Sequence, residues 1–86
     1  MNIENISSKI YEIQTDIINC NLDIIAIDLN PREIPTVHIT EDSFRKHFDS
    51  FKVIRRVTDE YPYELSENIG QVKFFCITKE DFGYES

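Results

Sequence analysis

The first twenty residues carry a stripe of isoleucines separated by polar positions. The stripe recurs with steps of three and four residues and consists of Ile3, Ile6, Ile10, Ile13 and Ile17, with Cys20 next in the series. This period places one apolar face along a helix, which we predict over residues 2–19 and which Asn21 can end. The same spacing is typical of a coiled-coil seam, although it spans only about two and a half heptads where about three to four are wanted.

Two kinds of partner could cover this stripe, namely the chain's own sheet or a helix of a second chain. A small sheet needs a helix on its apolar face. Isoleucine at both seam positions does not favour a two-stranded coiled coil. We therefore expect the stripe to pack mainly on the chain's own sheet, with a helix-mediated dimer as the alternative.

After the helix, the pattern changes to that of strands. The segment LDIIAIDL, residues 22–29, is rich in β-branched residues and apolar on both faces, which predicts a central strand. The next residues, NPRE, signal a turn. A second strand over 36–40 places Val37 and Ile39 inward and His38 outward, and we expect the two strands to form a hairpin.

A second helix is predicted over residues 41–49. Thr40 is suited to cap it, and the two acidic residues that follow suit the first turn of a helix. Its apolar side repeats with helical spacing and carries Phe44, His47, Phe48 and Phe51.

Two further strands complete the predicted fold. Alternation predicts strands over 52–58 and 71–78, whereas the polar stretch 59–70 is predicted to be a loop and the last residues are expected to fray. The order is αββαββ. We predict a single α+β domain over residues 1–86, with a four-stranded, mainly antiparallel sheet and two helices packed on one face.

Charge narrows the classes of partner. The chain carries sixteen acidic against nine basic residues, a net charge of −7. This balance argues against broad contact with nucleic-acid phosphates or an anionic membrane, and it suits a soluble protein or one that meets a basic surface. The two cysteines form no CxxC pair and no apolar signal segment opens the chain, so we expect a cytoplasmic protein with free thiols.

The residue types that carry catalysis or bind metals lack the spacing that those functions need. None of the histidines and cysteines lies at the pair spacing of a zinc site. Adjacent carboxylates such as Glu41 and Asp42 point in different directions on a helix or strand. A glycine-rich phosphate loop is excluded because the chain holds only Gly70 and Gly83. We therefore predict no enzyme activity, no metal site and no cofactor.

A basic band interrupts the acidic sequence between residues 43 and 58, where five bases face one acid, a local balance of +4. Such a band could bind a phosphate or an acidic loop of a partner. Its arginines could instead pair with acids on neighbouring strands, which is the interpretation we favour. The bases are Arg45, Lys46, Lys52, Arg55 and Arg56.

The stretch YPYE, residues 61–64, is the most distinctive short motif. Two tyrosines around a proline form a rigid aromatic surface, and tyrosine is enriched at binding hot spots. The alternative is a hairpin loop whose tyrosines pack on the rim of the sheet. We predict a binding site at these tyrosines and the acids around them, namely Asp59, Glu60, Tyr61, Tyr63, Glu64 and Glu67.

Residues 35–78 contain the stretches VHITEDSFRKHF, KVIRR and EYPYELSENIGQVKFFCI. In these stretches the chain resembles small uncharacterised proteins of prophages and other mobile elements of low-GC bacteria. The resemblance covers about half of the chain, brings no catalytic residue and leaves the N-terminal helix outside. It implies a genomic setting in which small proteins often block a host or competitor protein.

These observations lead to three functional hypotheses. The first is a non-enzymatic acidic protein of a phage or mobile element that inhibits a larger protein, such as a defence nuclease or a toxin, by covering its basic surface. The second is a self-associating protein that dimerises through the first helix or a sheet edge. The third is a small ligand-binding protein that uses the basic band, residues 45–56. None of them involves direct contact with nucleic acid or a membrane.

Overall fold

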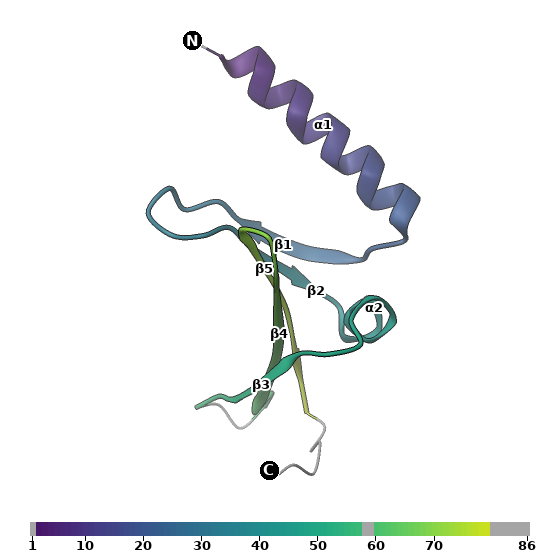
Figure 1. Cartoon of the computed structure of the whole chain (residues 1–86), viewed down its shortest axis with the longest axis vertical. Helices are drawn as coiled ribbons and strands as arrows, with labels where there is room; N and C mark the ends of the chain where they lie inside the picture. The colour runs from purple at the N-terminus through teal and green to yellow at the C-terminus, as the bar shows by residue number, and fades with distance from the viewer. Residues whose placement is uncertain (1, 58–59, 80–86) are drawn as a thin grey trace.

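The computed structural model describes residues 2–57 and 60–79 (Figure 1). An α+β fold with two helices in this part of the chain is confirmed, and the predicted helices and strands lie close to their predicted bounds, except that the strand predicted over 52–58 ends at Arg55. The elements in chain order are α1 (Ile3–Cys20), β1 (Ile24–Asp28), β2 (Thr36–Ile39), α2 (Glu41–His47), β3 (Lys52–Arg55), β4 (Tyr63–Ile69) and β5 (Val72–Thr78).

Within the described residues the strands form a five-stranded mixed sheet in the order β1-β2-β5-β4-β3. β1 pairs antiparallel with β2, and β3, β4 and β5 form an antiparallel meander. β2 and β5 are parallel, because the intervening α2, β3 and β4 provide the long crossover that a parallel pair requires. The predicted four-stranded, mainly antiparallel sheet is right in general character but lacks one strand and this parallel pair.

The additional strand is β4, which lies inside the stretch predicted to be a loop. Leu65 is fully buried opposite Cys76, while polar residues occupy alternate positions along the same strand. Glutamate and asparagine are depleted in strands, and they obscured this alternation in the sequence. Gly70 begins the tight turn into β5 with a φ of +61°, which glycine adopts without steric cost.

β1 lies at the edge of the described sheet, so its predicted central position is wrong. A bulge after Ile24 shifts the register, so that Ile24 lies opposite Ile39 and Ile27 lies opposite Val37. Ile25 is left 57% exposed. An edge strand has a neighbouring strand on one side only, and a run of apolar residues therefore overstated how deeply this strand is buried.

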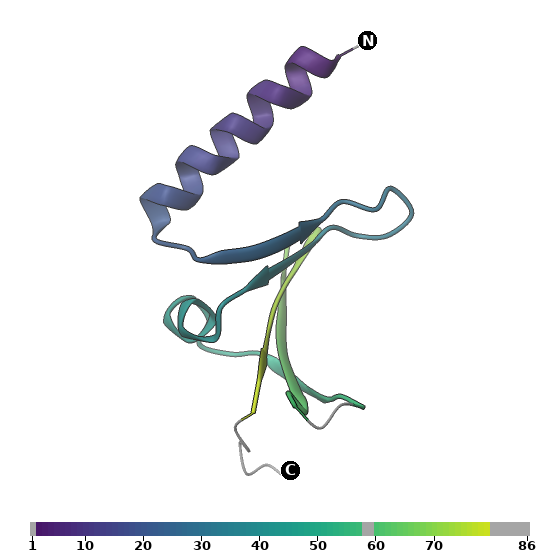
Figure 2. The same ribbon diagram turned by 180° about the vertical axis from the view of Figure 1, so that it is seen from behind.

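The core lies where α2 packs on one face of the sheet (Figures 1 and 2). Phe44 of α2 stacks on Phe48 with ring centroids 4.6 Å apart and meets Phe51 edge-on at 5.5 Å. The predicted cap is confirmed, because the Ser43 N–H donates to Thr40 Oγ1 at 3.2 Å. The buried apolar residues of the described chain are Val37, Ile39, Phe44, Leu65 and Cys76.

α1 projects away from the sheet (Figures 1 and 2). None of its residues, all of which the structure describes, is buried. Ile3, Ile6, Ile10 and Ile13 are 48–57% exposed. The prediction that the isoleucine stripe packs on the chain's own sheet is therefore wrong, and α2 is the helix that covers the sheet.

The connection between α1 and β1 gives the physical reason. Asn21 ends the helix in the left-handed conformation, with φ 57° and ψ 43°. The Leu22 N–H then donates to the Ile17 carbonyl at 3.2 Å, as in a Schellman-type cap. The next N–H, that of Asp23, donates to Ser43 Oγ at 2.9 Å and ties the start of β1 to α2. This turn is fixed at both ends and directs the helix axis away from the sheet.

Candidate functional site

An apolar groove of about 290 Å³ lies between the second half of α1 and the sheet. Ile13 and Ile17 line it from α1, Ile27 lines it from β1, and Val72 and Phe74 line it from β5. All of the residues around the groove are apolar. Because the stripe supplies one wall and the sheet supplies the other, the stripe faces the sheet across an open wedge.

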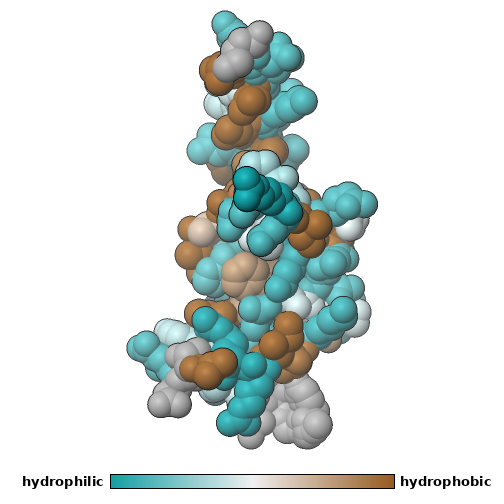
Figure 3. Space-filling model, turned by 90° about the vertical axis from the view of Figure 1, so that its left-hand side faces the viewer, coloured by the Kyte–Doolittle hydropathy of each residue, from teal (hydrophilic) through white to brown (hydrophobic). Residues whose placement is uncertain are grey.

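Beyond the groove, the stripe continues as an exposed apolar face toward the start of α1. Figure 3 shows hydrophobic side chains in a column along this helix, above the body of the molecule. Folded monomers rarely expose contiguous apolar patches larger than a few hundred Å². We refer to the isoleucine stripe together with three residues of the groove, Leu22, Ile27 and Leu29, as the α1 surface, which is formed by Ile3, Ile6, Ile10, Ile13, Ile17, Leu22, Ile27 and Leu29.

His47 connects the end of α1 to α2. Its ring nitrogens Nδ1 and Nε2 lie 2.9 Å from the Ser43 carbonyl oxygen and 3.1 Å from the Cys20 carbonyl oxygen. Both carbonyls accept, so a neutral ring donates to one of them and a protonated ring donates to both. The expected helix-packing role of His47 therefore takes the form of a brace that holds the C-terminal end of α1, while the rest of α1 stands clear of the sheet.

The site predicted around YPYE does not form one continuous face. Asp59 lies outside the described residues, and Glu60 is exposed. Along β4 the side chains alternate, so Tyr63 lies on the face of the core and Glu64 on the opposite face, where its carboxylate is 2.9 Å from Lys73 Nζ. The remaining predicted members are Tyr61, which is 37% exposed, and Glu67, which is half-buried on the core face.

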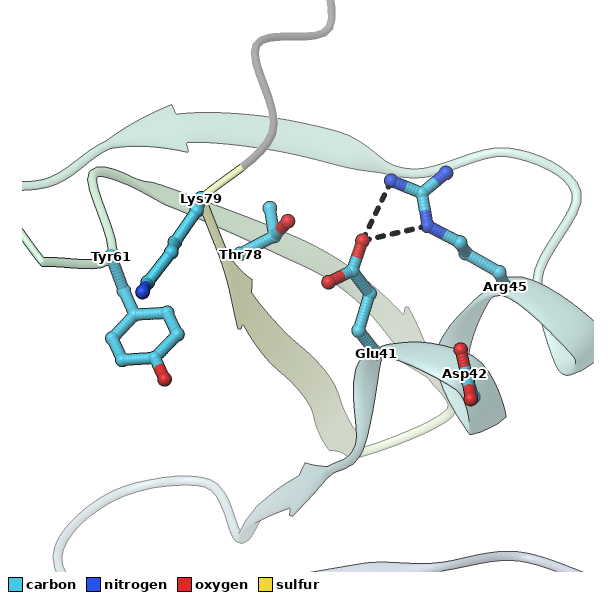
Figure 4. Close-up of a pocket in the computed structure, with 6 residues that line it drawn as sticks. All are labelled: Glu41, Asp42, Arg45, Tyr61, Thr78 and Lys79. Atoms are coloured by element: carbon cyan, nitrogen blue, oxygen red, sulfur yellow. Dashed lines mark hydrogen bonds and ion pairs between the residues drawn. The ribbon is translucent and has the colours of Figure 1, made fainter.

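The hollow in Figure 4 gathers several ionisable groups beside Tyr61 of this predicted site. Glu41 and Arg45 form an ion pair at 2.9 Å on one side. On the other side Lys79 Nζ lies 5.3 Å from the centroid of the Tyr61 ring. The hollow therefore alternates acidic and basic groups, which suits neither a single strong charge on a ligand nor an acid and base aimed at one atom.

The basic band is divided between α2 and β3. Arg45, on α2, pairs with Glu41 as stated above. Arg56 lies just after β3, and its Nη1 donates to the Tyr61 carbonyl at 3.2 Å. Arg55 lies over the Tyr63 ring, with Cζ 6.0 Å from the ring centroid. The three arginines of residues 45–56 thus contact groups of the chain itself, but the acid pair is within α2 and not, as predicted, with an acid on a neighbouring strand.

Among the described residues, two side chains have a pKa that departs from its ordinary value. His38 stacks on Phe75 with ring centroids 4.6 Å apart. Burial lowers its pKa, and the nearby positive charge of Arg56 lowers it further. Burial raises the pKa of the Cys76 thiol to about 11, so this thiol stays protonated at neutral pH and is a poor nucleophile. Both cysteines are free, and Cys20 is exposed.

Among residues 2–57 and 60–79, no three histidine, cysteine or acidic side chains gather where they could hold a metal ion. Neither of the helices in that part of the chain has the length and apolar character needed to cross a bilayer.

No family model, curated protein or solved structure matches this chain. The α1 surface is identified by its exposure and its apolar character. The three-and-four spacing of the isoleucines predicted the apolar stripe from the sequence. Whether the sheet covers that stripe depends on the direction of α1, which the turn at Asn21 sets.

Proposed function

We propose that this chain is a non-enzymatic protein-binding protein and that it docks on another folded chain through the α1 surface. The observation that carries the proposal is the exposure of the isoleucine stripe. Ile3, Ile6 and Ile10 are each more than half exposed on a helix that buries none of its residues. Removing such side chains from water is the main driving force of protein association.

The composition of α1 supports the same proposal. Most of the stability of an amphipathic helix in a protein comes from packing of its apolar face, and α1 buries none of its 18 residues. Isoleucine, which occupies six of the 18 positions of α1, has weaker helix propensity than alanine or leucine. A partner that packs along the stripe would supply the tertiary contacts that normally stabilise an amphipathic helix.

Charge bears on the role of such binding. The net charge of −7 favours the approach of a protein with a basic surface. In the mobile-element setting implied by the resemblance, this corresponds to an inhibitor or immunity-type protein that covers a nuclease or a toxin. In that role the acids and tyrosines of residues 59–67 would be the second contact region.

Recovery of partners by a tagged chain at low ionic strength tests this proposal. We expect wild type to recover a defined partner, either untagged copies of the chain or a different protein, from cells that express it. Ile6→Asp should abolish recovery, whereas Ser8→Asp, which adds the same charge to the polar side of α1, should preserve it. Equal recovery by the two variants, or none by wild type, would contradict a binding role for this face.

A further inference from the structure

We infer that the chain covering the α1 surface is a second copy of this protein, packed antiparallel about a two-fold axis. This inference rests on the proposed function and names its partner. It follows from three features of α1, namely the register of its apolar layers, the charges beside them and the apolar groove that side chains of a second helix would fill.

The apolar layers match over the whole helix when α1 is paired with itself in antiparallel orientation. In heptad terms, Ile3, Ile10 and Ile17 occupy one seam position, and the residues three places after each occupy the other. The preference of isoleucine at both seam positions for more than two strands applies to parallel coiled coils, whereas antiparallel packing sets each seam position against the other kind. Ile10 then faces Ile13 of the second copy, and the outer layers follow in the same register without a polar residue in the seam.

The charged residues beside the seam select this orientation. Lys9 and Asp16 both lie on one flank, each immediately before a seam isoleucine. In the register described, Lys9 faces Asp16 of the second copy, and the two-fold axis repeats the pair. On the other flank Ser7 faces Gln14, so no like charges meet. A parallel pair would set Lys9 against Gln14 and would form no ion pair across the seam.

The groove between α1 and the sheet can take up apolar side chains of a second helix. The stripe faces the sheet across this groove, so side chains of a helix packed on the stripe also meet Ile27 of β1 and Leu29, which follows β1. At roughly 60 Å² for each partly exposed apolar side chain, the eight residues of the α1 surface bury about 500 Å² per copy. Two copies reach about 1,000 Å² in total, which is the lower limit for a specific protein–protein interface.

The oligomeric state of the full chain is the first test. Sedimentation velocity and light scattering should show a dimer at micromolar concentration for wild type. Ile10→Asp should weaken the dimer by at least ~100-fold, because each substitution affects both central layers. Its circular dichroism should retain the signal of the sheet, because Ile10 is exposed in the single chain. Ser8→Asp should remain dimeric.

Charge exchange tests the orientation. Lys9→Asp and Asp16→Lys should each weaken the dimer by roughly three- to thirtyfold, because each removes two ion pairs and introduces two like-charge pairs. The double variant should return to within about threefold of wild type. Glu12→Lys, which lies away from the seam, is the matched control. Two single variants that dimerise as well as wild type, or a double variant as weak as the singles, would overturn this register.

Cross-linking tests the layers directly. Ile3→Cys places a thiol in the layer shared with Cys20 of the second copy, so a short bismaleimide should give a covalent dimer. The double variant Ile3→Cys/Cys20→Ser should not, because the two introduced thiols then lie at opposite ends of the pair. Buried Cys76 should not react. Efficient cross-linking of wild type through two Cys20 thiols would indicate a parallel pair and would overturn the inference.

The two proposals can fail separately. If wild type is monomeric but Ile6→Asp still prevents recovery of a different protein, the second-copy inference is wrong and the proposed function stands. If wild type is monomeric and Ile6→Asp changes no interaction, both are wrong. A dimer broken by Ile10→Asp supports both.

Discussion

Replacing Ile6 and Ile10 together by alanine distinguishes a surface stripe from a part of the core. The two side chains are 54% and 55% exposed and lie on a helix that buries none of its residues. If the stripe packed on the chain's own sheet, each truncation would cost ~2–5 kcal/mol of the free energy of unfolding.

The structure predicts a much smaller effect in the single chain. Few contacts of these side chains with the rest of the chain are available to be lost. Alanine also has a better helix propensity than isoleucine, by up to ~0.5 kcal/mol per residue. The two terms oppose each other, so the double variant should lie within ~1 kcal/mol of wild type. Leu65→Ala, at a fully buried position, should cost ~2–5 kcal/mol and calibrates the measurement.

The assay is urea unfolding followed by circular dichroism at two protein concentrations. In dilute protein, where a dimer dissociates, Ile6→Ala/Ile10→Ala should unfold close to wild type. In concentrated protein the second copy stabilises wild type by mass action, so the variant should unfold at a lower urea concentration than wild type. A loss above ~2 kcal/mol in the dilute sample would show that the stripe belongs to the core of the single chain and would refute the reasoning.

Three further predictions concern the other features of the structure. Because the pKa of His38 is lowered in the folded chain, the unfolded chain binds the proton first, and the free energy of unfolding should fall as the pH drops below 6.5. His38→Gln should reduce this dependence of the unfolding free energy on pH, measured by urea titrations. An unchanged dependence would contradict the lowered pKa of His38. In the monomeric Ile10→Asp variant, iodoacetamide at pH 8 should label Cys20 and spare Cys76, because burial raises the pKa of the Cys76 thiol to about 11. Mass spectrometry measures the labelling, and equal labelling of the two cysteines would be inconsistent with the burial of Cys76. Thr40→Ala removes the side-chain cap of α2 and should lower the free energy of unfolding by ~1 kcal/mol. An unchanged melting temperature would show that the Thr40 cap does not stabilise the fold.

The local elements could be predicted from the sequence because their signals are local. The period of the stripe located α1, and Thr40 located the start of α2. The alternation at Val37 and Ile39 gave the correct inward face of β2. In each of these cases a side-chain period or a capping residue acts within about one turn or a few residues of the chain.

The arrangement of the elements depended on features that no local pattern contains. The turn at Asn21 directs α1 away from the sheet, yet the stripe would look the same if the helix lay on it. β4 was missed because Glu64 and Asn68 have low strand propensity, and pairing with both neighbouring strands outweighs that preference. The parallel pairing of β2 with β5 joins residues far apart in the chain. The candidate surface was therefore visible as a pattern, but its exposure was not.

Hydrogen exchange of the α1 amides, measured over a range of protein concentrations, tests most directly whether a second chain covers the α1 surface. If it does, α1 exchanges rapidly in dilute protein and becomes protected as the concentration rises, while the amides of β4 and β5 are protected throughout. Protection of α1 that does not change with concentration, whether strong or weak, would contradict the account.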